Sequence, residues 1–214
     1  YFANIKTCEA INLALNSPEG GLIPGFKAVT QNSIPGSDRD IRGFEHGELS
    51  TYEGVPSGNK PIVLLLPGIM GSNLSRNSGK IGLNYFSAVF GGLIKLEYAN
   101  DSSITATSVI KTSYGRLASR LSAEYDVVIY PFDWRKQMND CAKEFDLKIK
   151  ELLQLGQPIK IVGHSMGGVL VRDFIINHDD TWQKLNRSKD FRLLFLGAPL
   201  GGSFRIPTVL FGQD

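Results

Sequence analysis

Four short runs of the chain are apolar at nearly every position and are bounded by turn residues. Runs of this length are typical of strands buried on both faces of a sheet, because neither face is left for polar side chains. The predicted strands are residues 61–68 (PIVLLLPG), 125–131 (YDVVIYP), 158–163 (PIKIVG) and 191–199 (FRLLFLGAP).

Between these runs, apolar residues recur every three or four positions, the spacing that lines one face of a helix. The predicted helices are residues 114–125, with Tyr114, Leu117 and Leu121 as the apolar stripe, residues 141–156 and residues 166–178. Strands that alternate with helices build a mostly parallel sheet with flanking helices. The predicted fold class is therefore α/β.

The segments that follow the predicted strands are the most suggestive chemically. They are Pro67–Gly71, Asp133–Arg135, Ser165 and Gly197–Pro199. Because chemistry in open α/β sheets collects at the carboxyl ends of the strands, these segments indicate one functional site at that edge.

Two stretches fall outside the regular pattern. Residues 1–59 are rich in Gly, Pro, Ser and Asn, with one helical pattern at residues 5–15 followed by broken extended segments such as GFKAVT and GELSTYEG. We interpret residues 1–59 as a leader or the tail of a preceding domain, with no assigned function. Residues 73–110, which include the strand-like SITATSVI, are interpreted as an insertion. It either shapes a substrate entrance or is a plain surface excursion.

A serine lies at the turn between the third predicted strand and the third predicted helix. Residues 163–167 (GHSMG) match the G-x-S-x-G nucleophile elbow, with Ser165 at its centre. Such a turn holds the serine in a strained backbone, and glycines two positions away relieve the crowding. The helix that follows directs N–H groups and the positive end of its dipole at the site. This context favours Ser165 as a nucleophile over an incidental serine at a bend.

An oxyanion hole needs two backbone N–H donors beside the nucleophile. Met166 directly follows Ser165 and supplies one candidate. The Pro-Gly turn after the first predicted strand supplies the other, with Ile69 preferred and Met70 as its neighbour. The alternative interpretation of that segment is an ordinary turn after a strand.

The bulk composition narrows the function classes. The 214 residues are 42% hydrophobic with a net charge of +2, which fits one globular domain. A small charge without basic runs gives no electrostatic case for nucleic-acid binding, and no apolar stretch is long enough to cross a bilayer. Cys8 and Cys141 are too few for a disulfide framework and are expected to be buried or idle thiols.

Four segments, in this order and at these separations, carry a family resemblance: PIVLLLPGIMGSNL, YPFDWR, IVGHSMGG and LGAPLGGS. They resemble the lecithin:cholesterol acyltransferase-like branch of the α/β-hydrolases. The similarity covers about residues 60–214 and none of the first 59. It implies that residues 60–214 are the N-terminal part of an α/β-hydrolase domain, ending after the strand that follows the nucleophile helix.

The resemblance also implies a chemistry. It predicts a Ser–Asp–His triad, no metal or organic cofactor, and acyl esters, often of lipids, as substrates. Ser165 matches the nucleophile of the family, and Ile69 and Met166 match its oxyanion donors. Asp133 and Arg135, in PFDWR, look structural and near the pocket floor. A lipid substrate would bring the protein to a membrane surface.

The rest of the triad is not found in the sequence. In this fold the acid and then the histidine follow the serine. The three histidines are His46 in the leader, His164 inside the elbow and His178 at the end of the next helix, and Asp214 is terminal. We therefore interpret the chain as a fragment. We expect it alone to be inactive and poorly soluble, or completed by another chain.

The predicted function is a serine hydrolase or acyltransferase that forms an acyl-enzyme on Ser165. Water as the acceptor gives hydrolysis and an alcohol or lysolipid gives transfer, and the sequence does not separate the two. The alternative is a catalytically inactive hydrolase fold that serves as a binding or scaffold module. Few cysteines and no visible leader favour an intracellular location, but the chain begins without methionine, so the compartment is left open.

Overall fold

The computed structural model describes residues 5–17, 48–49, 56–76, 79–81 and 104–204. Its larger sheet has the strand order β6-β2-β7-β8, and every neighbouring pair is parallel. The strands are β2 (Ile62–Leu66), β6 (Asp126–Ile129), β7 (Ile159–His164) and β8 (Arg192–Leu196). Each lies within or overlaps one of the four apolar runs, so the α/β prediction is confirmed.

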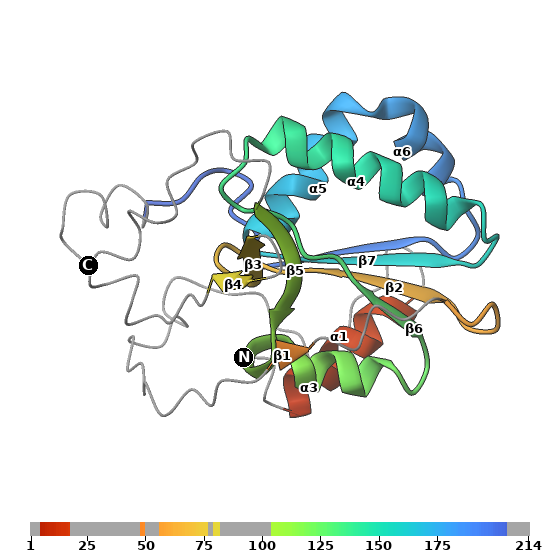
Figure 1. Ribbon diagram of the computed structural model, residues 1–214. Helices are drawn as coiled ribbons and strands as arrows, with labels where there is room; N and C mark the ends of the chain where they lie inside the picture. The colour runs from red at the N-terminus through yellow and green to blue at the C-terminus, as the bar shows by residue number, and fades with distance from the viewer. Residues whose placement is uncertain (1–4, 18–47, 50–55, 77–78, 82–103, 205–214) are drawn as a thin grey trace.

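Helices cover both faces of this sheet (Figure 1). The described helices are α1 (Ile5–Asn16), α3 (Lys111–Leu121), α4 (Met138–Leu153), α5 (Met166–Asn177) and α6 (Asp179–Asn186). Figure 1 shows α4, α5 and α6 on one side and α1 and α3 on the other. The molecule is thus a three-layer arrangement with the sheet in the middle.

Strand β2 shows directly why the apolar runs are continuous. Its five side chains are all buried, at most 1% exposed. Ile62, Leu64 and Leu66 pack with α4 and α5, whereas Val63 and Leu65 pack with α1 and α3. Because alternate side chains point to opposite faces, a central strand covered on both sides needs an apolar residue at every position.

The helix boundaries follow the prediction closely in two cases and less so in a third. Helices α4 and α5 coincide with the predicted segments to within three residues. Helix α3 starts at Lys111 and ends at Leu121, so the predicted 114–125 runs past its end. Tyr125 instead turns into β6, with its N–H bonded to the Leu121 carbonyl at 2.9 Å.

A second, smaller sheet was not predicted as a unit. It is antiparallel, with the order β1-β5-β3-β4. Its strands are β1 (Glu48–Leu49), β3 (Ser72–Arg76), β4 (Gly79–Ile81) and β5 (Ile104–Ile110). The strand expected in SITATSVI is confirmed as β5, whereas residues 77–78 and 82–103 of the predicted insertion lie outside the described residues. Since β3 begins six residues after β2 ends, the connecting loop is anchored by a sheet on each side.

Helix α1 packs against the larger, parallel sheet. Cys8, Ile11 and Leu15 are buried in the cluster that α3 and the sheet form on this face. Two cations of the sheet bind carbonyls at the end of α1: Lys160 Nζ donates to the Leu15 carbonyl at 2.9 Å, and Arg192 Nε to the Ser17 carbonyl at 3.2 Å. Cations suit the negative end of a helix, which here fixes α1 to β7 and β8.

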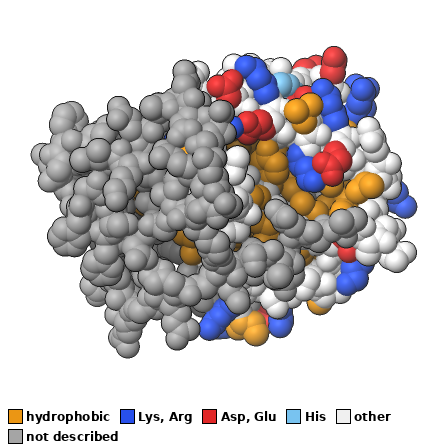
Figure 2. All heavy atoms as spheres, viewed as in Figure 1, with side chains coloured by type: hydrophobic (Ala, Val, Ile, Leu, Met, Phe, Trp, Pro, Cys, Tyr) orange, Lys and Arg blue, Asp and Glu red, His pale blue; other side chains and the backbone are white. Residues whose placement is uncertain are grey.

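On the face of the molecule shown in Figure 2, charged and hydrophobic side chains gather over different elements. Viewed as in Figure 1, charged side chains gather over α4 and α6, and hydrophobic ones lie across the middle, where the sheet is seen edge-on (Figure 2). Cys8 and Cys141 are both buried, as predicted, and are not joined in a disulfide. Among the described residues, no helix has the length and apolar character needed to cross a membrane.

Candidate active site

Ser165 occupies the turn between β7, which ends at His164, and α5, which begins at Met166. Its backbone has φ 50° and ψ −120°, a region that non-glycine residues rarely adopt. Strain of this kind costs about 1–3 kcal/mol and persists only where the surroundings impose it. Here the Ser165 N–H donates to the Leu196 carbonyl at 2.9 Å, which ties the turn to the end of β8. The side chain makes no capping hydrogen bond to α5, so its hydroxyl is not committed to the helix.

The glycines of the elbow are required because a side chain there would collide with neighbouring atoms. None of them has a positive φ. A Cβ on Gly163 would lie 2.9 Å from the Gly168 Cα, and one on Gly168 would lie 2.4 Å from the Ala198 Cβ. A Cβ on Gly167 would lie 2.5 Å from the Pro67 carbonyl oxygen. The start of α5 therefore packs directly on the loop after β2, which is the closeness that the G-x-S-x-G spacing permits.

The loop Pro67–Gly71 lies beside the elbow because β2 and β7 are neighbours, with Leu66 paired to Gly163. It closes with the Gly71 N–H bonded to the Gly68 carbonyl at 3.0 Å, and Met70 takes a positive φ of 55°. A Cβ on Gly68 would lie 3.0 Å from the Ser165 Cβ. The structure thus brings together the loop that holds Ile69 and the turn that holds Ser165 and Met166.

Tyr114 of α3 also reaches this site, although the sequence indicated it only as part of an apolar stripe. It is buried, and its hydroxyl lies 2.8 Å from the Gly68 nitrogen and 2.7 Å from His164 Nδ1. Burial raises the pKa of Tyr114 to about 12 and lowers that of His164. Both groups are therefore neutral at pH 7.

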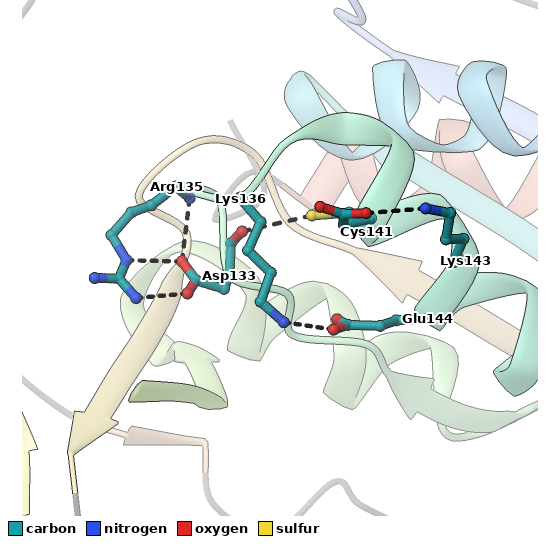
Figure 3. Close-up of polar contacts among 7 residues, drawn as sticks. Asp133, Arg135, Lys136, Cys141, Lys143 and Glu144 are labelled. Atoms are coloured by element: carbon teal, nitrogen blue, oxygen red, sulfur yellow. Dashed lines mark hydrogen bonds and ion pairs between the residues drawn. The ribbon is translucent and has the colours of Figure 1, made fainter. Parts of the chain in front are cut away.

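Asp133 and Arg135 form a buried ion pair in the loop after β6 (Figure 3). Arg135 Nε donates to Asp133 Oδ1 at 2.8 Å, a second guanidinium nitrogen donates to Oδ2 at 2.6 Å, and the Arg135 N–H donates to Oδ1 at 3.1 Å. Strand β2 lies between β6 and β7, which sets this loop about 10 Å to the side of the nucleophile strand. The Asp133 carboxylate is thus occupied by Arg135, an arrangement suited to holding a loop.

Each histidine within the described residues contacts another side chain. His164 contacts Tyr114 through Nδ1. His178 follows the last residue of α5, stacks on Phe174 with ring centroids 5.9 Å apart, and lies 3.6 Å from an oxygen of Asp146. His46 and Asp214 lie outside the described residues. Nor do the His, Cys, Asp and Glu residues of the described part form a cluster of three that could hold a metal ion.

A parallel sheet with helices on both faces, and a strained serine between a central strand and the next helix, define an α/β-hydrolase. The family model of the lecithin:cholesterol acyltransferases matches residues 84–213, more than half of the chain. The chain therefore belongs to the lecithin:cholesterol acyltransferase family. The loop of Ile69 lies before the matched region.

Individual relatives agree with this assignment. Human lysosomal phospholipase A and acyltransferase is 29% identical over 132 residues, which are 58% of this chain and 31% of that protein. Mouse phosphatidylcholine-sterol acyltransferase is 25% identical over 138 residues, which are 58% of this chain and 28% of that protein. The chain thus spans about a third of the length of these relatives. No solved structure matches it.

Proposed function

We propose that this chain carries the nucleophile of an enzyme that hydrolyses or transfers the acyl groups of lipid esters. The observation that carries the proposal is the backbone of Ser165, held at φ 50° and ψ −120° between a central strand and a helix N-terminus. Strain of this kind collects at functional sites, where the surroundings maintain it. The names of the relatives, which refer to phospholipase and acyltransferase activities, support an acyl ester of a lipid as the substrate class.

In the proposed reaction, Ser165 Oγ attacks the ester carbonyl carbon and its proton passes to a base. The carbonyl oxygen becomes an oxyanion, which the N–H groups of Ile69 and Met166 stabilise. The intermediate collapses, the alcohol leaves with the proton from the base, and the acyl group remains on Ser165. Water or a second alcohol then attacks the acyl-enzyme, which releases an acid or a new ester.

The base and the acid that orients it are assigned to residues outside the described part. His164 Nδ1 lies 2.7 Å from the Tyr114 hydroxyl, His178 lies 3.6 Å from an oxygen of Asp146, and the Asp133 carboxylate accepts from Arg135. In α/β-hydrolases the acid and the histidine follow the serine along the chain. We place Asp133 and Arg135 in a structural role near the pocket floor. Residues 60–214 are accordingly assigned to the N-terminal part of the hydrolase domain.

A fluorophosphonate probe tests the nucleophile in the intact protein. We expect covalent labelling on Ser165 that is lost in Ser165→Ala, because an activated serine displaces fluoride from the probe and becomes phosphonylated. Ser122→Ala is the matched control: the Ser122 hydroxyl donates to the Ser119 carbonyl of its own turn, and this variant should label as the parent does. Labelling that persists in Ser165→Ala would contradict the assignment. A folded, intact protein that does not label would favour the inactive scaffold instead.

A further inference from the structure

We propose that Tyr114 is a positioning residue for the reaction at Ser165: its hydroxyl fixes the oxyanion loop to the nucleophile elbow. The inference rests on the function proposed above and adds to it a residue from another part of the chain. Tyr114 does not touch the reacting atoms. It acts through the two backbone segments that its hydroxyl joins.

The two hydrogen bonds of the Tyr114 hydroxyl lie next to the proposed reacting groups. The Tyr114 hydroxyl lies 2.8 Å from the nitrogen of Gly68, the residue directly before Ile69. It lies 2.7 Å from Nδ1 of His164, the residue directly before Ser165. One hydroxyl therefore bridges the residues that precede one proposed oxyanion donor and the nucleophile. Its ring packs edge-on against the imidazole, with centroids 5.7 Å apart and planes at 65°.

The chemistry of the partners defines the donor and the acceptor in these hydrogen bonds. The Gly68 N–H can only donate, so the Tyr114 oxygen accepts from it. The phenol keeps its proton because burial raises its pKa to about 12, and the imidazole is neutral because burial lowers its pKa. We assign the Tyr114 proton to the bond toward Nδ1, which places the His164 proton on Nε2. The bridge then runs from Gly68 through Tyr114 to His164 with one donor and one acceptor at each step.

Gly68 and Gly71 bring the loop close to the Tyr114 hydroxyl and to the elbow. A Cβ on Gly71 would lie 3.1 Å from the Tyr114 hydroxyl, as well as 2.8 Å from the Gly68 carbonyl oxygen. A Cβ on Gly68 would lie 3.1 Å from His164 Nδ1 and 3.0 Å from the Ser165 Cβ. The loop thus closes around the hydroxyl and against the elbow at the same point. The side chain at the centre of that contact is Tyr114, at 3% exposure.

The consequence for the reaction follows from the precision that an oxyanion hole needs. Donors act when they lie about 2.7–3.1 Å from the position that the oxyanion will occupy. Loss of the hydroxyl removes a partner from the buried Gly68 N–H and from Nδ1, and the loop can shift relative to α5. We expect stabilisation of the transition state to fall more than the affinity for the substrate, because the substrate makes its other contacts elsewhere.

The test is the kinetics of fluorophosphonate labelling of Ser165 in the intact protein carrying Tyr114→Phe. We expect the maximal rate of inactivation to fall about 10- to 100-fold, less than for removal of a whole donor, with little change in the probe concentration that gives half of that rate. Labelling should still reach one probe per folded chain. Because only folded chains are counted, partial unfolding lowers the yield and not the rate constant.

Tyr125→Phe is the matched control. Tyr125 is buried in the same core cluster, and its hydroxyl also makes a hydrogen bond, to Asn16 Oδ1 at 2.8 Å, remote from the elbow. Both variants should lower the melting temperature, but only Tyr114→Phe should slow the reaction. Equal labelling rates in the two variants would overturn the inference and leave the assignment of Ser165 intact. A parent protein that does not label would instead overturn the proposed function.

His164→Asn provides a second route that does not depend on the folding of Tyr114→Phe. It removes the ring at the other end of the bridge, so it should slow labelling in the same way. In the double variant the two effects should not add, because each breaks the same bridge. Additive effects on the rate, or a His164→Asn variant as fast as the parent, would show that the bridge does not position the site.

Discussion

Gly167 lies where the start of α5 approaches the end of β2 so closely that a side chain would not fit. A Cβ there would lie 2.5 Å from the Pro67 carbonyl oxygen and 2.8 Å from the Leu66 Cβ. Neither neighbour is the flexible end of a side chain, so the backbone itself would have to move. The missing Cβ of Gly167 is therefore what allows α5 to begin against the end of β2, with the oxyanion loop and Ser165 side by side.

Gly167→Ala should consequently impair both stability and reaction. We expect a loss of about 1–3 kcal/mol in the free energy of unfolding, typical of overpacking, and slower labelling of Ser165 in the folded fraction. Chemical denaturation and labelling kinetics measure the two effects. Gly201→Ala is the control, because a Cβ there meets nothing within 4 Å and that glycine has no positive φ. If both alanines behaved alike, the contact at Gly167 would not be limiting.

Some residues of the site can be predicted from the sequence next to them, and others cannot. Ser165 and Met166 are adjacent and follow a strand pattern, so the sequence alone predicts them as candidates. Tyr114 lies 50 positions before His164, and a tyrosine at helical spacing indicates burial without saying where its hydroxyl points. Which residue lies beside the elbow is decided by the packing of α3 against the sheet, which no short pattern contains.

At the scale of elements, the sequence predicted those whose apolar pattern is strong. The four parallel strands and the helices α3, α4 and α5 were all predicted. Strand β3 (SNLSR) was not, because Leu74 is its one apolar residue and it shows no alternation. Helix α6 (DDTWQKLN) was missed for a related reason: two acidic residues open it, and few apolar positions mark its buried side. Its negative first turn suits a helix N-terminus, a signal that depends on knowing that a helix begins there.

The hydrogen bond from Lys160 to the end of α1 can be tested by substitution. Lys160→Met keeps the length of the side chain but removes the donor to the Leu15 carbonyl, so α1 should lose about 1.5–3 kcal/mol of stabilisation. Burial lowers the pKa of Lys160, so the folded chain releases this proton at a lower pH than the unfolded chain does, and stability rises with pH through that range. Hydrogen exchange should quicken in α1 and stay unchanged in α4. Lys148→Met, which breaks an exposed pair with Glu151, should leave both helices as they are; faster exchange throughout the protein would contradict a local role.

At the scale of the whole molecule, the loop after β6 joins the two sheets. Its Phe132 N–H donates to Ser72 Oγ at 3.1 Å, and its Trp134 indole donates to the Ser72 carbonyl at 3.4 Å. Ser72 begins β3, the strand that follows the oxyanion loop. The ion pair of Asp133 with Arg135 holds this junction, and the Asp133 carbonyl also accepts from Cys141 of α4. The loop thus connects the smaller sheet, the larger sheet and a covering helix.

Asp133→Asn should therefore destabilise the whole fold. The change keeps the shape of the side chain but removes the negative charge from a buried pair with Arg135, whose side chain is 5% exposed. Removal of one partner of a buried pair typically costs about 3–5 kcal/mol. Thermal unfolding measures the loss, and Asp140→Asn, in an exposed pair with Lys143, should shift it by less than about 1 kcal/mol. A rate of labelling at Ser165 that is unchanged in the folded fraction would support the structural role, and an abolished rate would contradict it.

The contact between the end of α1 and β8 also has a consequence for synthesis. Ser17 and Arg192, which bond to each other, are 175 positions apart. At about 5–20 residues per second, a ribosome adds that length in roughly 9–35 s. During this interval the apolar side chains of Cys8, Ile11 and Leu15 have been synthesised, but β8, one of the strands that α1 packs against, has not. Helix α1 is therefore exposed to aggregation during synthesis, and a chaperone that holds this helix would act before β8 is made.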